Sequence, residues 1–131
     1  MGSILIVDDD ESVRMGLCQL LQDRGYSCEE VENGARALEW VLVHEVELVI
    51  TDNQMPVMGG IGFLKSIRNI PLSNSPKVIF ITGNPSEALW KEANQAGAFA
   101  ILLKPCKTRE LLMAVNKALA ITRKERQCVL I

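Results

Sequence analysis

Residues 4–10 of the chain read ILIVDDD, and this short segment gives the strongest indication of the fold class. Four aliphatic residues without polar alternation suit a central strand of a parallel sheet that is covered on both faces. Three consecutive aspartates follow where such a strand would end. In open sheets of this kind, ligands bind beyond the carboxyl ends of the strands. The segment therefore predicts a layered α/β fold with a charged site at one edge of the sheet.

The rest of the chain repeats the pattern of a strand followed by an amphipathic helix. Ser27–Val31 alternates and carries two glutamates, as an edge strand would. Three further apolar runs have the length of a strand: Leu48–Thr51, Val78–Thr82 and Ala100–Leu103. Apolar residues at helical spacing fall in each interval: Val13, Leu17, Leu20 and Leu21; Leu38, Val41 and Leu42; Leu64 and Ile67; Leu89, Ala93 and Ala96; Leu111, Val115, Ala118 and Leu119. Asp10 and Ser86 are expected N-caps, and Gly97 an expected helix end. Five strands alternating with five helices predict a doubly wound α/β fold with a parallel sheet.

The bulk composition excludes several classes of protein. The 131 residues suit one compact domain, and the net charge of -2 gives no general attraction to nucleic acid or to an anionic membrane. The apolar runs are too short for a membrane span, and the N-terminus lacks the pattern of a secretory signal. Four scattered cysteines favour reduced thiols in a cytoplasmic protein over disulfides or a zinc site. We assign residues 1–121 to the domain and residues 122–131 to a C-terminal tail or the start of a linker.

The other central strands also end in residues that suit phosphate chemistry. The run at residues 48–51 leads into Asp52, the next ends at Thr82, and the last is followed by Lys104. Taken singly, each has an ordinary explanation: a loop acid, a β-forming residue and a solvated charge. Their joint position at one edge of the sheet, beside Asp8 and Asp9, favours a shared site.

The chemistry of such a site follows from its charges. Carboxylates about 4 Å apart repel each other by roughly 1 to 4 kcal/mol per pair, depending on the local dielectric. A hard divalent cation removes this conflict, and Mg2+ prefers a few carboxylates together with water and phosphate oxygens. Lys104 would supply positive charge to a phosphoryl group, and Thr82 a hydroxyl donor. Phosphoryl transfer depends mainly on positioning and charge neutralisation. We therefore predict that Asp52 is a nucleophile that accepts a phosphoryl group beside Asp8 and Asp9.

With these residues in place, the sequence resembles the response regulator receiver domains of two-component signalling. The resemblance rests on four stretches in the correct order, which together extend over roughly residues 3–121: ILIVDDDESVR, LVITDNQMPVMGGIGFL, VIFITG and AGAFAILLKP. It implies a flavodoxin-like sheet in strand order 2-1-3-4-5 flanked by five helices. It also implies a phosphorylation-activated switch that promotes its own phosphorylation and dephosphorylation, rather than an enzyme with a separate substrate.

The resemblance further assigns a metal site and a phosphoryl donor. Asp8, Asp9 and Asp52 would bind Mg2+, aided by the backbone carbonyl of Gln54. A histidine kinase or a phosphotransfer protein would donate the phosphoryl group to Asp52. Thus the acidic cluster inferred from charge becomes, by resemblance, a phosphoacceptor site with a cation as cofactor.

Other positions are assigned by the same resemblance, with two departures from the family pattern. Thr82 and Lys104 would contact the phosphoryl group, and the Lys104–Pro105 peptide bond would be cis. Thr82 and position 101 would form the switch, although Ile101 stands where family members commonly carry an aromatic residue. Cys106 replaces a frequent phenylalanine.

Partners are expected on the face formed by the fourth helix, the fifth strand and the fifth helix. Trp90 lies one step off the apolar stripe of the fourth helix, so we expect it to be partly exposed and to serve as an anchor, with packing against a neighbouring helix as the alternative. The expected partner is an output domain or another protein, with no direct contact to nucleic acid or membrane. Homodimerisation stays open.

Two other functions share parts of this pattern. In a phosphatase with an aspartyl nucleophile, Asp8 and Asp10 would have the required spacing, but Asp52 would then have no role. A flavodoxin-like FMN carrier would need a glycine- and hydroxyl-rich loop after the first strand, and three acids there would repel a phosphate instead. Both alternatives therefore fit the sequence less well than a phosphoacceptor.

Overall fold

The computed structural model describes residues 2–71 and 75–130, with side chains as far as residue 120. The strands are β1 (Ser3–Val7), β2 (Ser27–Val31), β3 (Leu48–Thr51), β4 (Lys77–Thr82) and β5 (Ala100–Leu103). The helices are α1 (Glu11–Asp23), α2 (Gly34–Val43), α3 (Gly60–Arg68), α4 (Glu87–Gln95) and α5 (Thr108–Leu130). The strands form one parallel sheet in the order β2-β1-β3-β4-β5, which confirms the predicted fold class and strand order.

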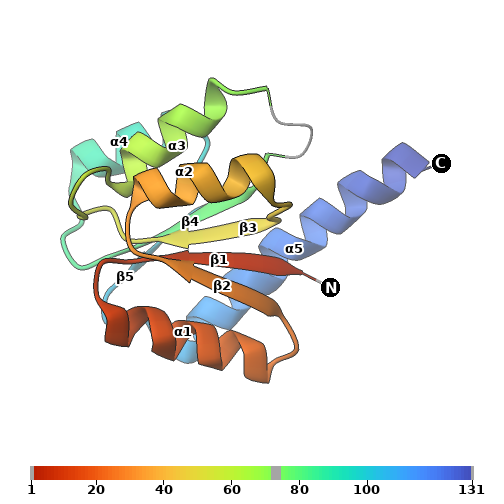
Figure 1. The fold of residues 1–131 in the computed structure, drawn as a ribbon, viewed down its shortest axis with the longest axis horizontal. Helices are drawn as coiled ribbons and strands as arrows, with labels where there is room; N and C mark the ends of the chain where they lie inside the picture. The colour runs from red at the N-terminus through yellow and green to blue at the C-terminus, as the bar shows by residue number, and fades with distance from the viewer. Residues whose placement is uncertain (1, 72–74, 131) are drawn as a thin grey trace.

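The helices cover both faces of the sheet (Figure 1). α1 and α5 lie on one face, and α2, α3 and α4 lie on the other. Along β1, Ile4 and Ile6 pack into the core under α1 and α5, whereas Leu5 and Val7 pack into the opposite core. Because successive side chains of a strand point to opposite faces, β1 is apolar at every position from Ile4 to Val7. This double burial explains why its sequence shows no polar alternation.

Capping residues begin and end the helices where the sequence indicated. The Asp10 carboxylate accepts hydrogen bonds from the backbone N–H groups of Ser12 and Val13 at 2.9 and 3.3 Å, so it caps α1. Ser86 caps α4, and Gly97 follows that helix with a φ of 85°. The left-handed conformation at Gly97 is one that a side chain would disfavour.

One apolar position of the predicted helices differs from the sequence expectation. The apolar stripe of α2 is wrong at Leu42, which is 51% exposed. Adjacent helical residues point about 100° apart, so burial of Val41 against the sheet turns Leu42 toward solvent. The division at residue 121 lies inside α5, because this helix continues to Leu130. The assignment of residues 122–131 to a tail or linker stays a prediction.

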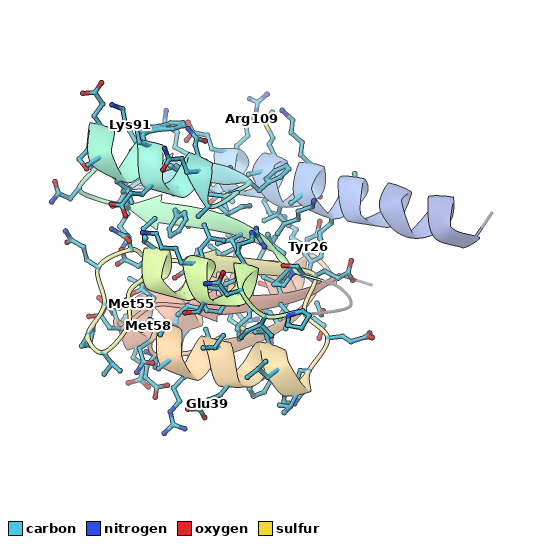
Figure 2. All side chains as sticks on the ribbon, turned by 90° about the horizontal axis from the view of Figure 1, so that it is seen from above. Tyr26, Glu39, Met55, Met58, Lys91 and Arg109 are labelled. Carbon is cyan, nitrogen blue, oxygen red and sulfur yellow. The ribbon has the colours of Figure 1, made fainter. Side chains whose placement is uncertain are left out.

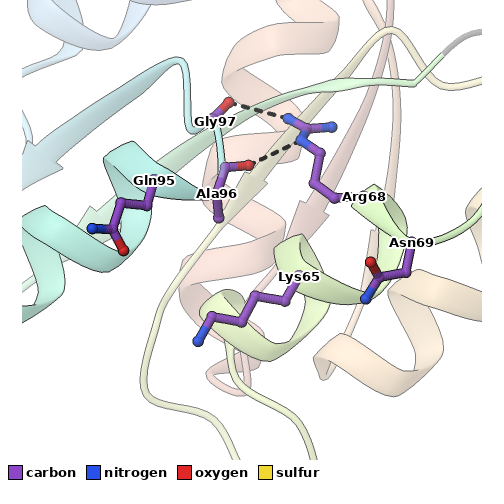
Figure 3. Close-up of a pocket in the computed structure, with 6 residues that line it drawn as sticks. All are labelled: Lys65, Arg68, Asn69, Gln95, Ala96 and Gly97. Atoms are coloured by element: carbon purple, nitrogen blue, oxygen red, sulfur yellow. Dashed lines mark hydrogen bonds between the residues drawn. The ribbon is translucent and has the colours of Figure 1, made fainter.

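The Arg68 side chain ties α3 to the carboxyl end of α4 (Figure 3). Its Nε donates to the carbonyl of Ala96 at 2.9 Å, and Nη2 donates to the carbonyl of Gly97 at 3.1 Å. The last carbonyls of a helix lack partners within the helix, so an arginine there satisfies them. An ion pair of 3.0 Å between Lys65 and Glu92 adds a second link between the two helices. α4 is thereby held against α3.

The N-terminus of α2 packs directly onto the loop between β3 and α3. The Gly34 N–H donates to the carbonyl of Met58 at 2.8 Å. A Cβ at Gly34 would lie 2.6 Å from that oxygen and 3.0 Å from the carbonyl oxygen of Gly59. Met55 and Met58 lie on this loop, at the end of the molecule away from the C-terminal end of α5 (Figure 2). Only glycine permits this backbone approach, which anchors the loop that follows Asp52.

Replacing Gly34 with alanine should lower the free energy of unfolding by about 1 to 3 kcal/mol, because two backbone oxygens must move to admit the Cβ. Gly16 provides the matched control, since a Cβ there would meet nothing within 4 Å. Gly16→Ala should instead stabilise α1 by roughly 0.5 to 1 kcal/mol. Urea denaturation measures both. Equal effects of the two substitutions would contradict the close approach at Gly34.

Candidate functional site at the carboxyl edge of the sheet

Parallel pairing of β1 and β3 places two aspartates side by side. Val7 pairs with Thr51, so Asp8 and Asp52 follow at neighbouring strand ends. The Asp52 N–H continues the ladder by donating to the carbonyl of Val7 at 3.0 Å. One carboxylate oxygen from each of Asp8, Asp9 and Asp52 lies within 4.8 Å of the others. The structure thus brings together the three acids that the sequence singled out.

Lys104 reaches this cluster from the end of β5. Its Nζ lies 2.9 Å from Oδ2 of Asp52 and 3.6 Å from Oδ2 of Asp8. The Asp8 and Asp52 side chains are only 5% and 12% exposed, so these contacts are partly shielded from water. One ammonium group faces three carboxylates, which leaves two negative charges without a compensating charge in the cluster when all are ionised.

Burial and charge shift the titration of both Asp8 and Lys104. Burial raises the pKa of the Asp8 carboxyl above its usual value, the N–H of Asp10 and the charge of Lys104 oppose this, and Asp52 and Asp9 raise it further. Burial would lower the pKa of Lys104, but its hydrogen bond to Asp52 and the charge of Asp8 raise this pKa above its usual value. Ionised Asp8 is therefore held at a free-energy cost that a bound divalent cation would remove.

Thr82 lies beside Lys104 at the ends of β4 and β5. Its side chain is buried, and its Oγ1 accepts a hydrogen bond from the N–H of Asn84 at 3.2 Å. The Lys104 N–H donates to the carbonyl of Thr82 at 2.8 Å, and the Lys104–Pro105 peptide bond is cis. The two residues expected to contact a phosphoryl group therefore lie on adjacent strand ends.

The sequence did not indicate two contacts that hold the acids in place. The N–H of Gln54 donates to Oδ1 of Asp52 at 3.2 Å, which orients that carboxylate. The Arg14 guanidinium donates to the backbone carbonyl of Asp8 at 2.9 Å. Arg14 lies one turn into α1, after the three aspartates. In the sequence, only this spacing could have suggested its contact with Asp8. The backbone carbonyl of Gln54 as a metal ligand stays a prediction.

Of the two predicted switch residues, Thr82 lies at the site, whereas Ile101 and the expected partner residues are not part of the acidic cluster. Ile101 is half-buried on β5 and pairs with Phe80 of β4. Trp90 on α4 is 48% exposed, which confirms its expected partial exposure. Leu103 on β5 and Met113 on α5 are also exposed large apolar residues. Each of the three expected partner elements thus carries an exposed large apolar side chain, and the switch role of Ile101 stays a prediction.

The structure also bears on the alternative functions. The Asp10 carboxylate is engaged at the start of α1, so it is not placed as the acid of a phosphatase pair with Asp8.

Cys18, Cys28 and Cys106 are free thiols. None of the helices in the described part of the chain combines the length and apolar character needed to cross a bilayer. The acidic edge of the sheet therefore remains the best-supported site.

Comparison with known proteins places this site in a family. A family model for the response regulator receiver domain matches residues 4–116. The chain is 37% identical over 117 residues to the chemotaxis protein CheY of Bacillus subtilis (strain 168), covering 88% of this chain and 96% of that protein. It is 34% identical over 120 residues to the sensor kinase CckA of Brucella abortus (strain 2308), covering 90% of this chain but 12% of that protein.

Another relative and two solved structures are also similar to this chain. The DNA-binding transcriptional regulator NtrC of Escherichia coli (strain K12) is 32% identical over 130 residues, which cover 96% of this chain and 26% of that protein. A CheY-like receiver domain protein from Methanospirillum hungatei JF-1 superposes with a TM-score of 0.88 at 29% identity, covering 95% of this chain and 98% of that chain. For the receiver domain of an HD domain-containing protein from Pseudomonas fluorescens Pf-5, the TM-score is 0.86 at 32% identity, with coverages of 94% and 98%.

The chain belongs to the response regulator receiver domain family. It is a signalling module of two-component systems, and its function is that of a phosphorylation-activated switch. The chain spans only a small part of the sensor kinase and of the transcriptional regulator, 12% and 26% of their lengths.

Replacing Asp8 with asparagine should stabilise the metal-free protein while weakening its binding of divalent cations. The raised pKa of Asp8 means that its ionised form costs stability at neutral pH, and that this cost disappears as the pH falls through the raised pKa. The gain of Asp8→Asn should be on the order of 1 kcal/mol, because the substitution removes a buried charge that Asp52 and Asp9 also repel. It should shrink between about pH 7 and about pH 4.

Urea denaturation in the presence of a chelator measures this gain at both pH values. Asp23→Asn is the control, since Asp23 is an exposed acid at the end of α1 that accepts a hydrogen bond from Gln19. A metal-free Asp8→Asn protein that is less stable than the wild type at neutral pH would contradict the account of the charges.

Proposed function

We propose that Asp52 accepts the phosphoryl group that switches this domain, in a reaction that depends on Mg2+. The observation that carries the proposal is the meeting of three carboxylates with the Lys104 ammonium at one edge of the sheet. An anionic phosphoryl group can approach such a cluster only when its negative charge is balanced. The excess of two negative charges therefore supports a divalent cation as part of the site.

The donor set fits Mg2+. Asp8, Asp9 and Asp52 offer carboxylate oxygens within 4.8 Å of one another, and hard oxygen ligands are those that Mg2+ prefers. In this proposal the backbone carbonyl of Gln54 adds a further oxygen. When bound, Mg2+ would neutralise the charge that develops on the transferring phosphoryl oxygens.

The chain's own residues position the reacting groups. The Asp52 carboxylate attacks phosphorus, and a new O–P bond forms while the bond from phosphorus to the donor breaks, which gives an acyl phosphate. The Gln54 N–H and the Lys104 ammonium contact the two oxygens of Asp52, so the carboxylate is oriented before the reaction. Lys104 and the Thr82 hydroxyl then contact the transferred oxygens. The same positioning serves the later hydrolysis of the acyl phosphate, so both steps are promoted by the domain itself.

The proposed donor is a histidine kinase or a phosphotransfer protein, and one relative is itself named a sensor kinase. The proposed output surface is the α4–β5–α5 face, where Trp90, Leu103 and Met113 are exposed. Thr82 and Ile101 would link the phosphorylated site to that face. The partner would be an output domain or a separate protein, and a second copy of the chain is the alternative. The net charge of -2 supports neither nucleic acid nor membrane as a direct partner.

We further propose that the protein acts in the cytoplasm. Cys18, Cys28 and Cys106 are free thiols, and Cys18 and Cys28 are buried near each other between α1 and β2 without a disulfide. Thiols persist in this form in a reducing compartment. A cytoplasmic location also suits a phosphoryl donor of the kinase class.

Incubation with Mg2+ and acetyl phosphate tests the phosphoacceptor directly. The wild type should gain the mass of one phosphoryl group, and Asp52→Asn should gain none because the nucleophile is gone. Intact mass spectrometry reads the result, with a chelator added to show the dependence on Mg2+. Asp23→Asn, which removes an exposed acid of α1, should be phosphorylated like the wild type. Equal phosphorylation of wild type and Asp52→Asn would overturn the proposal, as would a folded wild type that stays unmodified.

A further inference from the structure

We infer that Arg14 and Glu30 form a positioning pair that sets the affinity of the acidic cluster for a divalent cation. Glu30 holds the Arg14 guanidinium against the backbone carbonyl of Asp8, and this contact aims the Asp8 carboxylate into the site. The inference rests on the proposed function of the cluster and extends it to two residues outside the cluster.

The pair joins α1 and β2 to the end of β1. Arg14 lies in the first turns of α1, and its side chain is only 16% exposed. Its Nη1 donates to the carbonyl of Asp8 at 2.9 Å, and its Nε donates to Oε1 of Glu30 at 3.2 Å. Glu30 lies on β2, next to β1 in the sheet. A single guanidinium therefore contacts both strand ends, as its forked donors allow.

Asp8 is fixed from three sides. Its N–H donates to the carbonyl of Val31 at 3.2 Å, its carbonyl accepts from Arg14, and its Oδ1 accepts from the N–H of Asp10 at 2.9 Å. With the peptide and one carboxylate oxygen held, Oδ2 is directed at Lys104, 3.6 Å away. Of these contacts on Asp8, the one from Arg14 is the only one made by a side chain that substitution can remove without touching the cluster.

Glu30 also keeps the Arg14 guanidinium from forming an ion pair with the acidic cluster. A mobile arginine beside three carboxylates would pair with them, since such charge-assisted contacts are strong, and it would then compete with a cation. In the structure, Arg14 contacts a carbonyl of Asp8 rather than its carboxylate, while Glu30 neutralises the guanidinium. The pair is neutral as a whole, so it can orient Asp8 without opposing the entry of a positive ion.

The chain contains a matched control pair at the start of α2. Arg36 Nε lies 3.2 Å from Oε1 of Glu32, the same atoms and the same distance as in the Arg14–Glu30 pair. The Arg36 and Glu32 side chains are 60% and 52% exposed, and the second ion pair of Arg36 is with Glu39 at 3.8 Å. This pair carries the same charges near β2, but its arginine contacts two glutamates instead of the backbone of Asp8.

Isothermal titration of the full chain with Mg2+ at fixed ionic strength tests the inference. Arg14→Gln should weaken Mg2+ binding by about 10-fold or more, the usual effect of losing a group that orients a metal ligand. If Arg14 acted only as a nearby positive charge, Arg14→Gln would instead strengthen Mg2+ binding, because it removes a charge that repels the ion. Glu30→Gln should also weaken binding. The double substitution should cost no more than Arg14→Gln, because paired residues act as one unit. Arg36→Gln should change the affinity by less than about twofold.

Circular dichroism and thermal unfolding in chelator separate this role from a purely structural one. A structural role would lower stability and leave the Mg2+ affinity of the folded protein unchanged, which would overturn the inference. If Arg14→Gln folds poorly, the Mg2+ affinity of Glu30→Gln provides a second test. A Glu30→Gln protein with the affinity of the wild type would also overturn the inference. If the wild type binds Mg2+ and Arg14→Gln binds it equally or more tightly, only the positioning role fails. If the folded wild type itself binds no Mg2+, the proposed function fails and the inference fails with it.

Discussion

Mutual repulsion among the carboxylates of Asp8, Asp9 and Asp52 is the constraint on which the site depends. Parallel pairing of β1 and β3 forces two of these groups together, and the cluster lies within 4.8 Å. Lys104 and backbone N–H groups offset part of the repulsion, yet one cation cannot balance three acids. This remaining negative charge costs free energy, and the proposed divalent cation would offset that cost.

The fold keeps the repelling groups in place through contacts that lie outside the cluster. α1 starts at the capping carboxylate of Asp10, which leaves its two preceding neighbours for the site. The loop after Asp52 is held by the close approach of Gly34. Arg14 reaches the end of β1 from α1. Because these anchors come from α1 and α2, which lie on opposite faces, the geometry of the acids depends on packing across both faces of the sheet.

The sequence predicted the fold class, the strand order and the acids, since buried parallel strands leave continuous apolar runs and ligands gather at their carboxyl ends. It failed at Leu42, because three apolar residues in a short helix do not determine how that helix is rotated. It also missed the contact of Arg14 with Asp8 and Glu30. An arginine on an amphipathic helix usually faces water, and its partner on β2 is 16 residues away in sequence. Such contacts can be identified only once the positions of β1 and β2 in the sheet are known.

Binding of a stable phosphoryl analogue reports directly on whether Asp52 accepts a phosphoryl group. Beryllium fluoride occupies the place of a phosphoryl group on a carboxylate, and fluorine NMR reports its binding without turnover. The account predicts bound fluorine signals for the wild type that require Mg2+ and vanish in Asp52→Asn. Bound signals that persist in Asp52→Asn, or a folded wild type that binds no fluoride species in the presence of Mg2+, would contradict it.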